Sequence, residues 1–425
     1  MRKHNLYALV AAGLLAGGLA VPGASAADLG GNCCADLEER IAELEASTAR
    51  KGNRKVSLTV SGWVGQQITF WDDGVESNTY IHDLGSTLGS HVKFTGSAQI
   101  SPGWSAGYVL HIEAISNEGL LTNQDNPNAS SVYNLLGGAN LAGPGGVQTL
   151  QSYWFIKSDQ LGKISVGKQS QASDNTAILV DGSGSLVPAN WVAFDVNNFN
   201  VRLRDGTLSS LTWGATQSCF GMGGAWGDCN GLTQNVVRYD SPTFGGFSLS
   251  ASWGEDDMWD IAARYAGEHA GFKLAIAGAY TEVDQVNYNT VNVDADYFQL
   301  GVYVQHVPSG LFALYNFGTF ENNLTGQDDI DTHYVKVGLR TKFNHLGATV
   351  FYGEYLNGQD GDGTLDSTES ELEVWGLGVV QEIDAAAMSV WIKYRNLSYD
   401  DDNPIESVIG YEDFDYVGVG GLINF

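Results

Sequence analysis

The sequence predicts an all-β fold, a 16-stranded antiparallel transmembrane β-barrel that follows a short N-terminal periplasmic helix. Three observations predict it. From residue 55 onward, polar and apolar residues alternate along many short segments. Only 16 % of the residues are charged, against roughly 25 % in soluble domains. The chain also holds 54 glycines among 425 residues, well above the usual ~7 %. Together these features favour strands joined by turns and a surface that need not face water.

The charge balance excludes one class of partner. The chain carries 49 acidic and 21 basic residues, which gives a formal charge of −28. Nucleic-acid binding needs Lys and Arg side chains to neutralise phosphates, and a strongly acidic chain repels a polyanion. Because no basic tract offsets the balance, we expect no nucleic-acid partner.

Residues 1–26 have the pattern of a secretory signal peptide. Arg2 and Lys3 form a basic start, residues 6–20 are an apolar run, and residues 24–26 (Ala-Ser-Ala) are a small-residue cleavage site. Removing these two bases and no acid takes the formal charge from −28 to −30. No later stretch approaches the ~18 uncharged apolar residues of a membrane helix, so we expect an exported protein without a helical span.

Residues 27–54 form a predicted periplasmic segment with helical periodicity. Its a/d seam consists of Cys34, Leu37, Ile41, Leu44 and Thr48. Two heptads associate weakly alone, although a barrel that gathers three copies would raise their effective concentration and allow a short coiled coil. A frayed, solvated helix is the alternative. Cys33 and Cys34 could pair between chains, bridge each other or remain free.

The region 55–425 has a dominant period of two. Val56, Leu58 and Val60 alternate with Ser57 and Thr59, and the same pattern recurs along the chain, which indicates strands with one apolar and one polar face. Sixteen such segments lie at 55–70, 90–101, 104–115, 149–158, 162–169, 234–240, 246–254, 259–266, 271–282, 296–306, 310–320, 333–343, 347–356, 371–383, 387–398 and 414–425.

The connections between these segments alternate in length. Seven short turns and eight longer loops suit an even-stranded barrel with short periplasmic turns and long external loops. A soluble β-sandwich is the competing interpretation, since it also alternates. The membrane barrel is favoured because the polar faces consist mainly of Ser, Thr, Gln, Gly and Tyr, and because aromatic residues near strand ends suit two interfacial girdles. These aromatic residues are Trp104, Phe247, Trp253, Tyr265, Phe272, Phe343 and Tyr394.

The last strand ends in the alternating segment 420–425, whose terminal Phe425 resembles the signal read by the bacterial barrel-assembly machinery. The whole mature chain then resembles the alphaproteobacterial porin family, the major trimeric porins of Rhizobiales-type outer membranes. The residues that carry the resemblance lie at 32–45, 56–64, 162–169, 211–214 and 239–242 and at the C-terminal Phe425.

This resemblance implies a homotrimer of sixteen-stranded barrels in the outer membrane of a Gram-negative bacterium, surrounded by lipid and lipopolysaccharide. It also implies that the third external loop folds inward and narrows a passive channel for ions and small hydrophilic solutes. Neither an enzymatic activity nor a cofactor is expected.

The residues themselves lead to the same mechanism. A barrel of ~16 strands is too wide for side chains to fill, so it encloses an aqueous channel. The connection at 170–233 is by far the longest and is rich in aromatic residues, which favours packing over disorder. We expect it to be the constriction loop, with Asp174, Asp181 and Asp195 facing the pore. Cys219 and Cys229 are predicted to form a disulfide in it, two free thiols being the alternative.

Strand parity predicts a basic wall opposite these acids, because a Lys or Arg on the lipid face costs about 2–4 kcal/mol at midplane. The predicted wall residues are Lys93, Arg264, Lys336, Arg340, Lys393 and Arg395. Acids on the loop and bases on the wall would create a transverse field across the pore. Acidic external loops predict a slight preference for cations, which the inner bases oppose.

Two motifs suggest other chemistry. Residues 103–107 match G-x-S-x-G, but a nucleophile elbow needs a strand-to-helix turn, and here the motif begins a strand. Residues 360–369 have part of the spacing of a calcium loop, yet Gly358 stands where the first ligand belongs and no helices flank it. No metal site is therefore predicted. A substrate-specific channel of the same fold remains the alternative function.

Overall fold

The computed structural model describes residues 56–127, 131–133, 140–142, 146–217, 233–254, 257–288, 291–323, 329–361 and 369–425. The predicted signal peptide, the segment 27–54 with Cys33 and Cys34, and the pair Cys219 and Cys229 lie outside the described residues. No helix in the described part of the chain is both long and apolar enough to cross a membrane.

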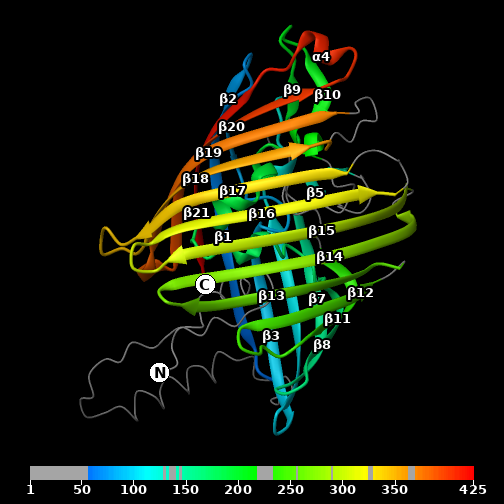
Figure 1. Cartoon of the computed structure of the whole chain (residues 1–425), viewed down its shortest axis with the longest axis vertical. Helices are drawn as coiled ribbons and strands as arrows, with labels where there is room; N and C mark the ends of the chain where they lie inside the picture. Colours follow the sequence, from blue (N-terminus) through cyan, green and yellow to red (C-terminus); the bar gives the residue numbers. More distant parts are fainter. Residues whose placement is uncertain are drawn as a thin grey trace.

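The described strands close into an antiparallel barrel with sixteen strand positions (Figure 1). The first strand, β1 (Thr59–Asp72), pairs with the last, β21 (Phe414–Asn424), from Trp63–Asn424 to Asp72–Asp415. The other strands are β2 (Ser77–His82), β3 (Ser90–Ser101), β4 (Trp104–Ile115), β7 (Gly146–Ser158), β8 (Gly162–Ser170), β11 (Thr233–Asp240), β12 (Phe247–Gly254), β13 (Trp259–His269), β14 (Phe272–Tyr288), β15 (Val291–His306), β16 (Leu311–Asn322), β17 (Ile330–Thr341), β18 (Thr349–Gln359), β19 (Ser370–Ile383) and β20 (Met388–Asp401).

All sixteen predicted segments correspond to strands of this barrel, with two differences. The predicted strands at 271–282 and 296–306 are longer in the structure, because β14 and β15 continue to Tyr288 and from Val291. Their added inward residues Val283 and Ala295 are buried in a cluster with Tyr297. This packing extends the pairing of β14 with β15. It cannot be predicted from the sequence of either strand alone.

The second difference is an interruption in the second strand position. β2 pairs with the later half of β1, and β3 pairs with its earlier half. The two strands thus share one position, and the seven residues between them, 83–89, leave the wall. Leu84 and Leu88 of this insertion are buried, so it folds toward the interior. This insertion was not predicted from the sequence.

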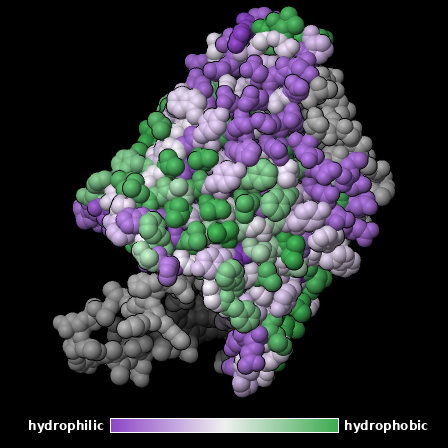
Figure 2. Space-filling view, in the orientation of Figure 1, coloured by the Kyte–Doolittle hydropathy of each residue, from purple (hydrophilic) through white to green (hydrophobic). Residues whose placement is uncertain are grey.

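The outward faces agree with the predicted lipid-facing parity. Phe247 and Trp253 are each 62 % exposed, and Phe343 is 67 % exposed. Figure 2 shows hydrophobic residues gathered across the wall at the level of β13 to β16, and hydrophilic residues toward the end that holds β9 and β10. Short turns link the strands at the opposite end, and Gly103 adopts a positive φ of 76° in the turn between β3 and β4, which favours glycine.

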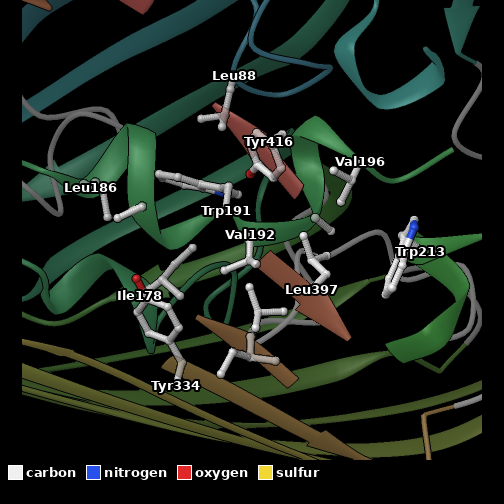
Figure 3. Packing of buried hydrophobic residues seen from close by; sticks show 14 of the residues in the cluster. Leu88, Ile178, Leu186, Trp191, Val192, Val196, Trp213, Tyr334, Leu397 and Tyr416 are labelled. Atoms are coloured by element: carbon white, nitrogen blue, oxygen red, sulfur yellow. The ribbon is translucent and has the colours of Figure 1, made fainter. Parts of the chain in front are cut away.

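The hydrophobic core lies inside the barrel. The connection from β8 to β11 contributes η2 (Ile178–Val180), α3 (Leu186–Asn190), η3 (Val192–Asp195), β9 (Asn200–Arg202), β10 (Leu208–Thr212) and η4 (Trp213–Gln217). In Figure 1 its green helical turns lie inside the wall formed by β15 to β19. Figure 3 shows Ile178, Trp191 and Val192 of the connection beside Tyr334 and Leu397 of the wall.

This core corrects one prediction. The inward faces were expected to be polar, but from β16 to β21 they are largely apolar. Leu314, Val350, Leu356, Val374, Val380, Leu397 and Phe414 all point inward and are at most 1 % exposed. They are dry because the connection packs on them, so this part of the wall resembles a protein core rather than a channel lining.

Candidate functional site

The inward connection between β8 and β11 enters the lumen along β12 to β15. The backbone N–H of Ala172 donates to the Ser252 hydroxyl (2.9 Å), and that of Ser173 donates to the Asp260 carboxylate (2.7 Å). The N–H of Ala177 donates to the Gln299 side-chain oxygen at 2.7 Å. Polar wall residues thereby satisfy backbone groups that would otherwise be buried without partners. The connection is therefore tied to the wall from its first residues.

Asp181, one of the three predicted pore acids, is bound by Lys336 of β17. Lys336 Nζ donates to Asp181 Oδ2 at 2.6 Å and to the side-chain oxygen of Asn190 at 2.5 Å. Both side chains of the ion pair are fully buried. Two charges buried in this way hold the loop tightly only while both are present, because either one alone would be an uncompensated charge.

Asp195 is the second predicted acid, and four side chains converge on it. Lys393 of β20 donates to it at 2.5 Å, Gln67 of β1 at 2.6 Å and the Tyr416 hydroxyl at 2.9 Å. Arg395 lies 3.9 Å away. Burial alone would raise the pKa of Asp195, but Lys393 and the other cationic neighbours hold this pKa at about 2. The carboxylate is therefore ionised at all ordinary pH values.

Arg395 and Arg340 fix the backbone of the same connection. Arg395 donates to the carbonyl oxygens of Ala189 and Val192, and its Nε donates to Glu354 at 2.7 Å. Arg340 donates to the Ser183 carbonyl at 2.9 Å and forms a two-pronged pair with Glu382 at 2.5 and 2.6 Å. These guanidinium groups are anchors between wall and loop.

At these positions the predicted acids and bases form direct ion pairs. Asp181 and Asp195 were expected to face the wall bases across water, but each carboxylate is within 2.6 Å of a lysine nitrogen. The parity prediction was correct for Lys336, Arg340, Lys393 and Arg395, all of which point inward. These acids and bases lie closer together than predicted, because the connection packs directly against this side of the barrel wall.

Asp174, the third predicted acid, differs from the other two. Its side chain is half-buried and accepts a hydrogen bond from Asn175 (2.7 Å), with no ion pair to any described residue. Burial raises the pKa of Asp174 to about 7. Arg264 lies near it and donates to Thr176 and Ser250 at 2.8 and 3.2 Å. Asp174 is thus a titratable acid at the partly open edge of the connection.

Lys93 of β3 points inward, as predicted, but it does not meet the connection. It pairs across the sheet with His111 of β4, and the rings of His91 and His111 lie 4.1 Å apart. Within the described residues Lys93 has no ion pair. Lys336, Arg340, Lys393 and Arg395 each bind a carboxylate, and Arg264 binds the inward connection. Among the described residues, Lys93 is the one predicted wall base that does neither.

The family of the chain follows from its sequence as a whole. A profile of Gram-negative porins matches residues 8–420. The chain belongs to the Gram-negative porin family. It is thus an outer-membrane porin, and the barrel with its inward connection is the channel-forming part. No curated protein sequence matches significantly.

Solved structures of porins and related channels share the fold. The anion-selective porin from Comamonas acidovorans is 16 % identical, with a TM-score of 0.54, 87 % of this chain and all of that chain being covered. OmpT of Vibrio cholerae is 12 % identical, with a TM-score of 0.52 and coverage of 88 % and 99 %. The channel DcaP of Acinetobacter baumannii is 9 % identical, with a TM-score of 0.50 and coverage of 88 % and 99 %.

The insertion at 83–89 is a part of the porin interior that the sequence analysis missed. Asp83 accepts from the N–H groups of Gly85, Ser116 and Gly119 at 2.9, 3.0 and 3.2 Å. Glu118 accepts from the N–H and hydroxyl of Ser86 at 2.6 and 2.8 Å. Burial raises the pKa of both carboxyls, and together with the nearby Asp83 charge it brings the pKa of Glu118 to about 8.

This insertion touches the inward connection directly. A methyl group on Gly85 would lie 2.9 Å from the ring of Phe194, so the two segments are in close contact. The run Asp83-Leu-Gly-Ser-Thr-Leu-Gly-Ser90 carries the glycine and serine pattern of a turn. That pattern is the sequence signal for the insertion, and it lies between the predicted strands 55–70 and 90–101.

The connection also reaches the end of the barrel where the longer loops lie. Arg202 of β9 pairs with Asp73, which follows β1, at 2.8 Å. Burial opposes ionisation, yet the hydrogen bond from Arg202 lowers the pKa of Asp73. Among the described residues, no group of three or more His, Cys, Asp or Glu side chains is arranged to hold a metal ion. Ser105 of the G-x-S-x-G motif lies within strand β4, after a turn that joins two strands.

Proposed function

We propose that this porin is a passive, water-filled channel for ions and small hydrophilic solutes, narrowed by residues 170–233 and without enzymatic activity. The observation that carries the proposal is the set of ion pairs between the inward connection and one side of the barrel. These ion pairs to β17, β20 and Asp73, together with the hydrogen bonds to β12, β13 and β15, hold the connection against these strands. The opposite side keeps accessible inward residues, among them the exposed Lys157 and the half-buried Tyr153 of β7.

The predicted acids and bases then have two separate roles. They are not simply two oppositely charged walls that face each other across the pore. Lys336, Arg340, Lys393 and Arg395 hold the constriction loop in place, together with Asp181 and Asp195. Arg264 also holds the loop, through the Ala172 carbonyl and the Thr176 hydroxyl, so Asp174 and Lys93 are the predicted residues left to influence passing ions. A constriction fixed by buried charges keeps a constant cross-section, which suits ohmic diffusion better than gating.

The surrounding assignments belong to the same proposal. Residues 1–26 act as a signal peptide, residues 27–54 as a periplasmic helix, and residues 55–425 as the barrel. Cys219 and Cys229 form a disulfide, Phe425 is the signal for the barrel-assembly machinery, and the protein belongs to the alphaproteobacterial group of porins in a membrane that contains lipopolysaccharide. Phe425 supports its role by its position, since it closes on Gly62 through two backbone hydrogen bonds of 3.0 Å.

A homotrimer is supported by the outer face of the barrel. From β14 to β21 the outward residues near the longer loops include many carboxylates, such as Glu282, Asp296 and Glu373. On β1 to β8 the outward residues at this level include fewer carboxylates, although Asp72 and Lys168 are charged, and Phe70 and Ile81 are 47 % and 64 % exposed. A largely apolar face that continues toward the end of the barrel suits contact with neighbouring subunits.

The test is conductance of the purified protein in planar lipid bilayers. We expect ohmic current that rises in three equal steps, with little saturation by any solute. Absence of conductance would overturn the proposal. Saturable block by a single solute class would instead favour the alternative, a substrate-specific channel of the same fold.

A further inference from the structure

A cavity of about 170 Å³ lies between α3 of the inward connection and the barrel wall. It is lined mainly by Trp63, Leu88, Leu186, Trp191, Trp391 and Leu422. Figure 3 shows Leu88 and Leu186 on different sides of Trp191. These residues belong to the hydrophobic core that the connection forms with the wall, and the cavity is a space left within that core.

The cavity lies toward the short-turn end of the lumen. Ser389 and Asn424 contribute to its lining, and both adjoin the ends of strands β20 and β21. Its other side is α3, which Lys393 anchors through the Pro188 carbonyl (2.9 Å) and Lys336 anchors through Asn190. Because buried ion pairs hold both walls, the cavity is formed before any ligand arrives, which lowers the entropic cost of binding.

The apolar surface of the cavity fits one aromatic ring. The indole N–H of Trp63 donates to the Leu88 carbonyl (3.1 Å), and that of Trp391 donates to the Gln67 side-chain oxygen (3.0 Å). These two tryptophans therefore offer their carbon surfaces and no free donor. An apolar cavity of about 150 Å³ is large enough to hold a benzene-sized molecule.

The polar part of the lining selects the group attached to that ring. Glu382 contributes a carboxylate, and Asn424 uses its amide N–H on the Ala387 carbonyl (3.1 Å), which leaves its oxygen as an acceptor. Ser389 adds a hydroxyl. Arg340 already pairs with both oxygens of Glu382, so the lining offers oxygen acceptors and no unpaired cation, which favours a ligand with a hydrogen-bond donor and disfavours one that buries its own carboxylate.

We propose that this cavity is a binding subsite for small aromatic solutes that carry a hydrogen-bond donor, a hydroxyl or an ammonium group. The proposal adds a solute class to the channel function proposed above, and it rests on that function for the route by which the solute arrives. Binding itself is measurable without any current, so the two proposals fail separately.

The experiment is isothermal titration calorimetry of the detergent-solubilised full-length porin with phenol, benzylamine and benzoate, against a detergent blank. We expect phenol and benzylamine to bind with dissociation constants on the order of 1 mM. Benzoate should bind at least about tenfold more weakly, because its carboxylate would be buried without a cationic partner, the Arg340 guanidinium being paired with Glu382 already. The conductance of the same preparation tests the channel function independently.

Two variants test whether the measured binding takes place in the cavity. Val187 lines it from α3 and is half-buried, so Val187→Trp should fill it and weaken phenol binding by about tenfold or more. Leu422→Phe, on the barrel wall, should narrow the cavity. It replaces Val187→Trp in the test if that variant does not assemble into a barrel. Val75→Trp, at a 54 % exposed position between β1 and β2, is the matched control and should bind phenol like the wild type.

The proposal is overturned if the wild type binds neither phenol nor benzylamine. It is equally overturned if the assembled cavity variants bind both as the wild type does, or if the control loses binding. Tight benzoate binding would refute the selection for a donor. Selective binding that both cavity variants remove, in protein that conducts normally, would establish the subsite.

Discussion

Asp195 and Lys393 lie 2.5 Å apart inside the barrel although 198 residues separate them in the chain. Asp195 belongs to the inward connection, and Lys393 belongs to a wall strand on the far side of the sheet. The pair joins the inward connection to the barrel at a deeply buried point, with the Asp195 and Lys393 side chains only 9 % and 3 % exposed. Together with Asp181–Lys336, it explains how so long a connection stays inside the channel.

The first prediction concerns this pair. Lys393→Met should lower the free energy of unfolding by about 3–5 kcal/mol, because it leaves the Asp195 carboxylate buried with less compensation. The double variant Asp195→Asn, Lys393→Met should recover part of the loss. Thermal unfolding in detergent measures both. Lys342→Met is the control, since Lys342 and Asp384 form an exposed pair worth at most about 1 kcal/mol. Equal losses in Lys393→Met and Lys342→Met would contradict the prediction.

The second prediction concerns acid. The pKa of Asp195 is lowered to about 2 in the folded protein, against about 3.9 for an unperturbed Asp. Its stabilising contribution is therefore complete above pH ~4 and is lost as the pH falls toward 2. We expect the wild-type conductance to stay constant from about pH 6, below the titration of Asp174, down to about pH 4 and to become noisy or larger below it. In Asp195→Asn this acid-dependent change should be much smaller.

The third prediction concerns Asp174, whose pKa is raised to about 7. Since its charge appears as the pH passes through 7, the cation-to-anion permeability ratio should rise by about twofold between pH 6 and 8. Reversal potentials in a KCl gradient measure this ratio. Asp174→Asn should abolish the change, whereas Asp205→Asn, at an exposed position on the loop hairpin, should keep it. A flat wild-type profile would show that Asp174 does not face the ion path.

The fourth prediction concerns the clamp on the insertion at 83–89. Burial raises the pKa of Glu118 to about 8, so the folded protein binds a proton that the unfolded chain releases near pH 4.5. Stability should therefore fall as the pH rises through this window and level off above about 8. Glu118→Gln should remove part of this loss, measured as the melting temperature at pH 6 and pH 9. Glu76→Gln, at an exposed site, should leave it unchanged.

The fifth prediction concerns the contact between Gly301 of β15 and the connection. A methyl group on Gly301 would lie 2.1 Å from the Ala177 carbonyl oxygen, so Gly301→Val must displace backbone. We expect a loss of about 1–3 kcal/mol and a changed single-channel conductance. Gly278→Val is the control, because a methyl group there meets only ordinary contacts of 3.5 and 3.7 Å. A conductance change in Gly278→Val alone would contradict the assigned path of the connection.

Much of the wall could be predicted from the sequence because strand parity is a local property. Residues two apart share a face, so the alternation around Lys336, Lys393 and Arg395 was enough to place all three inward. The position of the long connection was equally readable, since predicted strands at 162–169 and 234–240 bound it. The predicted aromatic girdle residues Phe247 and Trp253 are also exposed on the outer face.

The contacts inside the barrel could not be predicted in this way. Alternation says that Lys336 points inward, but it does not say whether water or Asp181 will meet it. Whether Asp181 reaches Lys336 depends on the path of the connection between β8 and β11. It also depends on the register of strands that are distant from this connection in the sequence. The apolar inward face from β16 to β21 is a consequence of the same path.

By itself, the sequence determined the barrel, its parity and the boundaries of its longest connection, because these depend on periodicity and length. Only the tertiary structure decided that the connection lies against one wall, that its acids are bound by lysines, and that a tryptophan-lined cavity forms beside α3. The physical reason is that these features arise from contacts between residues more than a hundred positions apart, such as Asp195 and Lys393.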